Sequence, residues 1–198
     1  EVNEWSSNTI WVGLFDILFP NTNITNFYEF KNNLSLSKSN TLGFAARCEG
    51  RKNPHYLDGV KSYIFTNSVE FNTIWREGVK IDTSKSKVYH YKPEFKNMFY
   101  TMDWGISHSC FTSEPFGYGI FEAVDNGKLP IIHTQWCSDL KYPYRASSKK
   151  EFNDIYSEIT SQSYETKLFW FNKIKTFMKR NFTDKDYWIE SLLDIYNI

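Results

Sequence analysis

Short apolar segments alternate along the middle of the chain with segments whose apolar residues recur at helical spacing. The apolar segments have the length of buried strands and cover residues 41–46, 63–66, 87–91, 104–108 and 129–132. Helical spacing is found between them, in residues 56–63, 70–77, 92–100 and 117–124. Strands that alternate with helices indicate a parallel sheet with right-handed crossovers. We therefore predict an α/β fold in which helices flank a parallel sheet.

The two ends of the chain have a different pattern. Three amphipathic helices are predicted after the sheet, over residues 149–159, 164–180 and 183–196. Residues 1–40 mix apolar pieces with Asn- and Ser-rich stretches and are predicted to be a lead-in from a preceding domain. Residues 41–160 would then form the main domain, and residues 161–198 would be C-terminal helices packed on it. The apolar segment 10–19 is too short to cross a bilayer and contains Asp16.

The most informative stretch lies between the fourth and fifth predicted strands. Pro115, Gly117 and Gly119 favour a tight loop, and a helix is predicted to begin at about Gly117. The first N–H groups of a helix have no partner within the helix and lie at the positive end of its dipole. The stretch is therefore a candidate binding site for a phosphate group.

Two glutamates flank this predicted helix start. Glu114 precedes it, and Glu122 lies one to two turns inside the helix. Carboxylates repel phosphate, so their suitable role is to accept hydrogen bonds from hydroxyl groups of a sugar or a ribose. The alternative is that Glu114 is favoured by the helix dipole and Glu122 is a solvated helix residue.

Two cations follow the first predicted strand. Arg47 and Lys52 are five positions apart, and a fork-shaped guanidinium beside an ammonium group can neutralise a diphosphate. Ligands of parallel sheets bind beyond the carboxyl ends of the strands, which puts this loop, His90 and Glu114 on one rim. The alternative is a solvated basic loop.

The sequence from Glu114 onward resembles the E-x7-E motif of retaining GT-B glycosyltransferases. The resemblance covers residues 41–198 and implies a Rossmann-like sheet, the donor-binding C-terminal half of a GT-B fold. It implies that Glu114 contacts the transferred sugar and that Glu122 holds the ribose of the nucleotide. The backbone of Phe116, Gly117 and Tyr118 would then approach the sugar and the diphosphate.

Arg47 and Lys52 also match this family, whose members carry G-R-x4-K after the corresponding strand. Ala46 stands where the family usually has glycine. The resemblance implies that the two cations stabilise the departing nucleoside diphosphate. It also implies that His90 and Tyr91 lie near the nucleobase, although a packed aromatic strand end is the alternative for these two residues.

Composition removes several other classes of function. The chain has 23 basic and 23 acidic residues, so no net charge attracts nucleic acid or membranes. Three distant cysteines and four histidines lack metal-ligand spacing, so we expect reduced thiols, no metal, no cofactor and a cytoplasmic protein. Hydrolase and P-loop motifs are absent from the sequence. The acidic pair Asp184 and Asp186 fits a helix start better than a metal-binding D-x-D motif.

The expected function is transfer of a sugar, with retention of configuration and without metal, from a nucleotide sugar such as UDP-glucose. Transfer would require an acceptor domain or a partner chain. The segment around Trp136 and residues 140–145 faintly resembles phage DNA α-glucosyltransferases, which would place the enzyme in the host cytoplasm. Modified phage DNA and a surface glycan are both candidate acceptors. A module that binds nucleotide sugars without catalysis is the alternative.

Overall fold

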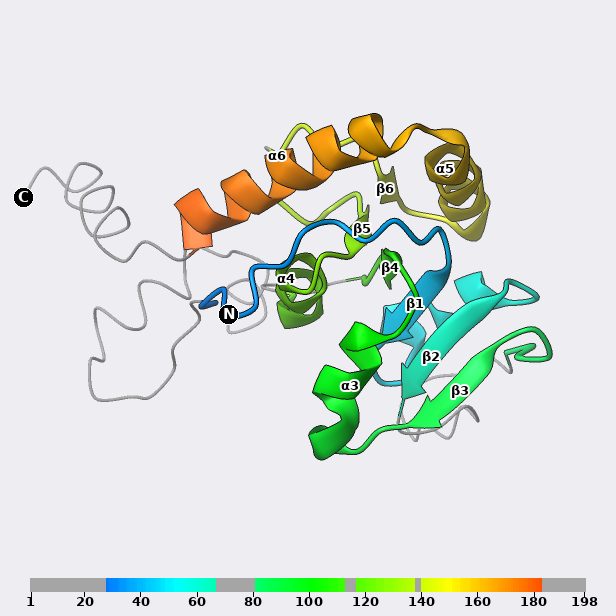
Figure 1. The fold of residues 1–198 in the computed structure, drawn as a ribbon. Coiled ribbons are helices and arrows are strands. Elements are labelled where there is room, and N and C mark those ends of the chain that lie inside the picture. Colours follow the sequence, from blue (N-terminus) through cyan, green and yellow to red (C-terminus); the bar gives the residue numbers. More distant parts are fainter. Residues whose placement is uncertain (1–27, 67–80, 113–116, 138–139, 183–198) are drawn as a thin grey trace, which may run out of the picture.

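A six-stranded, all-parallel sheet forms the centre of the protein (Figure 1). The computed structural model describes residues 28–66, 81–112, 117–137 and 140–182. The strands are β1 (Leu42–Ala45), β2 (Ser62–Thr66), β3 (Lys87–His90), β4 (Ile106–Ser109), β5 (Leu129–His133) and β6 (Arg145–Ala146). The α-helices are α3 (Lys96–Thr101), α4 (Tyr118–Asp125), α5 (Lys149–Ser161) and α6 (Tyr164–Phe182). Short 3₁₀ helices are η1 (Gly50–Lys52), η2 (Pro54–Leu57) and η3 (Pro93–Phe95).

The strand order is β3-β2-β1-β4-β5-β6, the order of Rossmann-like sheets. The chain builds outward from β1 to β3 and then crosses back, so that β4 pairs with the other side of β1. Leu42 of β1 therefore lies opposite Ser62 of β2 on one side and Ile106 of β4 on the other. The junction between β1 and β4 is the point where the order reverses. The predicted α/β fold with a Rossmann-like parallel sheet, flanking helices and C-terminal helices is confirmed.

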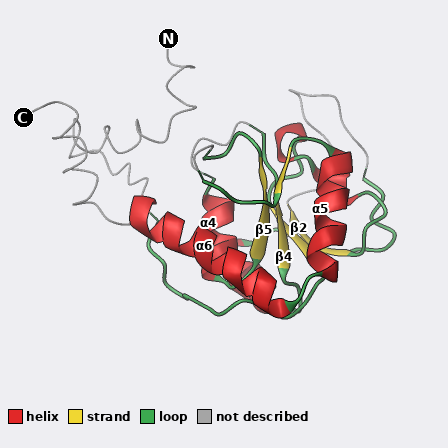
Figure 2. Ribbon diagram, turned by 90° about the horizontal axis from the view of Figure 1, so that it is seen from above, coloured by secondary structure: helices red, strands yellow, loops and turns green. Residues whose placement is uncertain are grey.

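Helices cover both faces of the sheet. Figure 2 shows α4 and α6 on one side of the strands and α5 on the other. Buried residues include Phe44 and Ile64 on the central strands, Phe121 on α4, Phe152 on α5 and Phe171 on α6. This apolar burial is the main force that holds the layers together.

A smaller aromatic cluster attaches α3 to the first half of the sheet. Phe99 and Tyr100 of α3 are buried with Phe65 of β2 and with Trp104, which precedes β4. The Phe65 and Phe99 rings are stacked with centroids 5.1 Å apart. Trp104 also packs so closely on β1 that a Cβ at Gly43 would lie 2.1 Å from its ring, which explains glycine within that strand. This cluster fixes α3 beside the first half of the sheet.

Residues 28–40 form a strap that is tied to the domain. The carboxylate of Asp125, at the end of α4, accepts hydrogen bonds from the backbone N–H groups of Lys31, Asn32 and Asn33. Leu36 is buried in the main core. In Figure 1 the strap runs between α6 and α4. These described residues pack on the sheet domain, whereas the domain that residues 1–40 were predicted to connect remains a prediction.

The structure corrects the sequence prediction in two places. Residues 56–63 were predicted to be a helix, but they contain the end of η2, a turn at Gly59, whose φ is +68°, and the first two residues of β2. The helix ends early because this left-handed conformation is incompatible with a continuing α-helix. The two-residue strand β6 was not predicted. The helices predicted over residues 70–77 and 183–196 lie outside the described residues.

Within the described part of the chain, no helix is both long enough and apolar enough to span a membrane.

Candidate functional site

The candidate site lies at the carboxyl ends of β1 and β4, beside the point where the strand order reverses. The loop after β1, residues 46–53, contains the two predicted cations. The loop after β4 begins with residues 110–112 and leads to α4. Crevices at this position are where open parallel sheets bind their ligands.

The loop after β1 contains an acidic residue that organises its cations. Glu49 accepts a hydrogen bond from Arg51 at 2.9 Å and forms an ion pair with Arg47 at 3.1 Å. Partial burial alone would raise the pKa of the Glu49 carboxyl, but the hydrogen bond and the nearby positive charges together lower it. Arg47 thus lies at the predicted position, with 62 % of its side chain exposed and its charge shared with Glu49.

Lys52 belongs to the loop after β1, and its side chain reaches the loop after β4. Its Nζ atom is 4.5 Å from the centre of the Phe111 ring, which belongs to the loop after β4. This cation–π contact holds the ammonium group at the junction of β1 and β4.

Asn53 ties the two loops together, and sequence analysis did not identify it. It is buried and has a left-handed backbone, with φ of +50°. Its side-chain amide donates to the carbonyl oxygen of Cys110 at 2.8 Å and to Thr112 Oγ1 at 3.1 Å. The N–H of Thr112 in turn donates to the carbonyl of Arg51 at 2.8 Å. These three hydrogen bonds fix the cationic loop against the loop that leads to Glu114.

His108 holds the backbone of Asn53 in place. Its Nε2 atom lies 2.9 Å from the Asn53 carbonyl, which can only accept, so Nε2 carries the proton. Its Nδ1 accepts from the N–H of Cys110 at 3.4 Å. Burial lowers the pKa of His108 to about 4, so the ring is neutral at physiological pH. His108 therefore has a structural role, as a neutral donor that positions the loop.

The start of α4 packs closely on Trp136, which follows β5, and a Cβ at Gly119 would lie 4.0 Å from the Ala45 carbonyl oxygen of β1. Gly117 has φ of +76°, and a Cβ there would lie 2.9 Å from Ile120 Cδ1 and 3.1 Å from Trp136 Nε1. Tyr118 is the first residue of α4 and is 43 % exposed. No side chain among the described residues caps this helix, and the N–H of Ile120 donates to the Gly117 carbonyl at 2.7 Å in its first turn. Glu114 and Phe116 lie outside the described residues.

Glu122 lies on α4 and has partners on α3. Lys96 Nζ forms an ion pair with one carboxylate oxygen of Glu122. The hydroxyl of Tyr100 donates to the other oxygen at 3.4 Å. The Glu122 side chain is 22 % exposed, so it remains accessible from the surface. Sequence analysis predicted the position of Glu122 on the helix but not its contact with α3.

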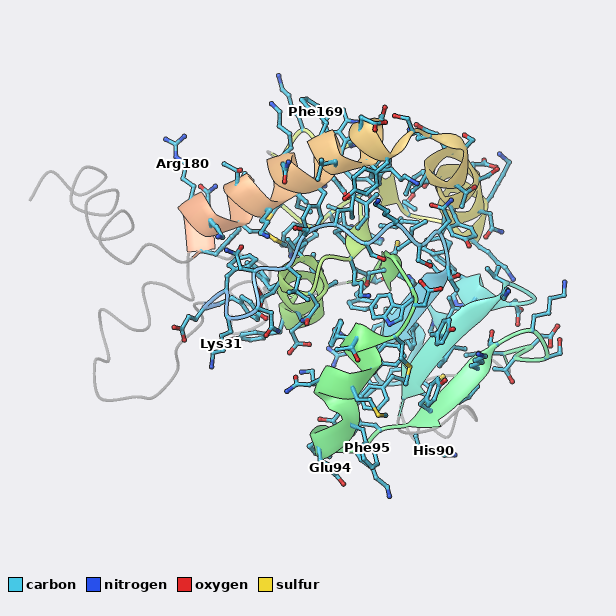
Figure 3. All side chains as sticks on the ribbon, in the orientation of Figure 1. Lys31, His90, Glu94, Phe95, Phe169 and Arg180 are labelled. Carbon is cyan, nitrogen blue, oxygen red and sulfur yellow. The ribbon has the colours of Figure 1, made fainter. Side chains whose placement is uncertain are left out.

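His90 and Tyr91 lie at the end of β3, two strands from the junction. Figure 3 shows His90 at the same corner as Phe95, which precedes α3. A cavity of about 330 Å³ opens here between β3 and α3, and its walls are mainly aromatic rings and methionines. Its lining residues are Phe65, Val88, Tyr89, His90, Lys92, Phe95, Met98, Phe99 and Met102. A flat apolar group such as a nucleobase would fit these walls.

The described residues contain no group of three or more His, Cys, Asp or Glu side chains that could bind a metal ion. Asn53 and Lys52 connect the loop after β1 to the loop after β4, whereas Glu122 is paired with Lys96 of α3. Tyr91 and the cavity near His90 lie farther out on the same half of the sheet, beyond β2. No contact in the described structure connects that cavity directly to the β1 loop.

Comparison with known proteins adds nothing to this geometry: no family model, curated protein or solved structure matches the chain. The fold and the position of the site define a Rossmann-like α/β protein with a candidate anion site at the junction of β1 and β4. Because this fold carries many different activities, the function must be argued from the residues of the site.

Proposed function

We propose that this chain is the donor-binding domain of a retaining, metal-independent GT-B glycosyltransferase. The observation that carries most weight is the connection made by Asn53 between the cationic loop after β1 and the loop that leads to Glu114. It holds the cationic loop where Lys52 lies over the Phe111 ring, and a Cβ at Gly119 of α4 would lie 3.4 Å from that ring. The spacing of Glu114 and Glu122, which resembles the E-x7-E motif, supports the same assignment.

In the proposed reaction, the bond between the anomeric carbon of the sugar and the diphosphate breaks, and a bond to the acceptor oxygen forms. Negative charge accumulates on the leaving nucleoside diphosphate. Arg47, Lys52 and the positive end of the α4 dipole stabilise this charge. Glu114 orients the sugar and Glu122 binds the ribose. The nucleobase would lie toward His90 and Tyr91, where the apolar cavity opens.

The donor is a nucleotide sugar such as UDP-glucose, which a cytoplasmic enzyme would find in its own compartment. Either modified phage DNA or a surface glycan is the acceptor, and an acceptor domain or a partner chain completes the enzyme. A module that binds nucleotide sugars without catalysis is the second candidate. The ion pair of Arg47 with Glu49 favours this candidate, because it reduces the positive charge available to a leaving diphosphate.

The Lys52→Met variant tests the diphosphate site. Calorimetry with UDP, GDP and ADP measures binding, and we expect the variant to lose at least tenfold in affinity because a charge-assisted hydrogen bond contributes about 1.5–3 kcal/mol. If the chain is catalytic, release of sugar from the matching nucleotide sugar should fall on the order of a hundredfold. Lys61→Met is the matched control. Lys61 is exposed just before β2, at the amino end of that strand, whereas the candidate site lies at the carboxyl ends of the strands.

The outcomes separate the two candidates. Binding together with sugar release supports the enzyme, and binding without turnover, also when candidate acceptors are added, supports the module. If the wild-type chain binds none of the three nucleotides, or if Lys52→Met binds as well as Lys61→Met, the donor-binding assignment is overturned.

A further inference from the structure

Two side chains of α3 hold the carboxylate of Glu122. Lys96, in the first turn of α3, forms an ion pair with Oε1, and the hydroxyl of Tyr100 donates to Oε2. Because Lys96 and Tyr100 are four positions apart, they lie on the same face of the helix. Each oxygen of the Glu122 carboxylate therefore has one donor from α3.

The support behind these donors is rigid. Tyr100 is 3 % exposed, and its ring packs on Phe99 and Trp104 with centroids 6.0 Å and 5.5 Å away. A buried aromatic side chain with packed neighbours has little rotational freedom. Burial, and then the nearby Glu122 charge, raises the pKa of Tyr100, so its hydroxyl stays protonated and continues to donate. The direction of the Glu122 carboxylate is thus set by the aromatic cluster under α3.

An ionised carboxylate has about four lone-pair sites, and α3 occupies two of them. The other two remain for groups that approach from the surface. Two hydroxyls on adjacent carbons, as in a ribose, can donate to one carboxylate at the same time. Glu122 is 22 % exposed, which allows this approach.

A brace between α3 and α4 is the simpler explanation for the Lys96–Glu122 pair. However, α3 is already attached to the sheet by Phe99, Tyr100 and Trp104, which are buried. Lys96 is 36 % exposed at its side chain, and ion pairs with this degree of exposure contribute little to stability. The effect of Lys96 on the carboxylate can therefore be separated from its effect on folding.

We propose that Lys96 and Tyr100 are positioning residues for a ribose site, which hold the Glu122 carboxylate so that its outer lone pairs meet the 2′ and 3′ hydroxyls of a nucleotide. This inference rests on the proposed donor-binding function and adds two residues to it. It also specifies that the ligand is a ribonucleotide rather than a deoxyribonucleotide.

The test compares each ribonucleotide with its 2′-deoxy counterpart. Calorimetry is run with UDP, GDP and ADP and with dUDP, dGDP and dADP. The wild type is expected to prefer the ribonucleotide at least tenfold, since a site that binds a hydroxyl rejects an analogue without it. Lys96→Met should reduce this preference at least fivefold, and Lys96→Arg should retain most of it. Tyr100→Phe keeps the buried ring and should also reduce the preference.

Lys87→Met is the control, because Lys87 is exposed at the start of β3, outside the apolar cavity, and its Nζ lies over the Tyr63 ring rather than near Glu122. The melting temperature of each variant checks that folding is intact. If the wild type binds no nucleotide, the proposed function fails and this inference fails with it. If the wild type binds nucleotides but shows no ribose preference, the ribose role of Glu122 is overturned together with the roles of Lys96 and Tyr100, and nucleotide binding stands. If the wild type shows the preference but Lys96→Met and Tyr100→Phe both keep it in full, only the roles of Lys96 and Tyr100 are overturned.

Discussion

Replacing Asp125 by alanine is expected to lower the free energy of unfolding by about 3 kcal/mol or more. Asp125 is 1 % exposed, and its carboxylate accepts three backbone N–H groups of the strap, the shortest of them from Asn33 at 2.6 Å. The hydroxyl of Tyr28 also donates to it at 3.2 Å. A hydrogen bond to a charged group contributes about 1.5–3 kcal/mol, and each donor left buried without a partner adds a further cost.

Urea denaturation followed by circular dichroism measures this loss. Asp154→Ala is the matched control, because Asp154 on α5 is 64 % exposed and its ion pair with Lys150 is a surface pair. Such a pair is worth at most about 1 kcal/mol. Equal stability losses in the two variants would show that the strap does not depend on Asp125.

The second large effect is a loss of stability in mild acid caused by His108. The folded protein binds a proton at His108 with a pKa of about 4, whereas the unfolded chain binds it near the ordinary value of 6.5. Between these two values the unfolded state holds more protons, so stability falls as the pH falls. The contribution of His108 is complete above pH 6.5. The expected loss from this one residue is about 2 kcal/mol at pH 5 and approaches about 3 kcal/mol below pH 4.

The measurement is urea denaturation between pH 7.5 and 4.5 for the wild type and for His108→Gln. A glutamine side chain does not titrate in this range, so the variant should have lower stability at pH 7.5 and a flatter dependence on pH. Burial also lowers the pKa of His55 and His133, and both residues remain in the variant. Parallel curves for the two proteins would contradict the buried, neutral state of His108.

The sheet could be predicted from the sequence because its central strands are nearly continuous apolar segments. A strand buried on both faces has this pattern, and β1, β2 and β5 follow it. Strand β4 contains the polar residues Ser107 and Ser109, and the strand predicted over residues 104–108 overlaps it but begins two residues early and ends one residue early. The two residues of β6 are too few to form a pattern. The early end of η2 depends on Gly59, whose backbone conformation a helical pattern does not reveal.

The candidate site could be predicted only in part. The spacing of Arg47 and Lys52, and the glycines before α4, indicated which loops matter. Asn53 and Lys96 were missed because their partners are set by the folded backbone, whereas the partners of Glu49, Arg47 and Arg51, are only two positions away. Asn53 contacts a carbonyl 57 positions away, and Lys96 pairs with a residue 26 positions away. Pairs of this kind have no spacing that a sequence pattern could reveal.

The pairing of β1 with β4 has a consequence for how the protein folds. The chain makes β2 and β3 before it makes β4, so one edge of β1 stays unpaired until the second half has been synthesised. Contacts between distant segments form slowly, and partly formed sheets can associate with other chains through their open edges. The candidate anion site lies where β1 and β4 meet, and this pairing is the one that forms late. A ligand that bridges β1 and β4 would therefore also favour the last step of folding, and such a ligand is a natural additive for producing the protein in soluble form.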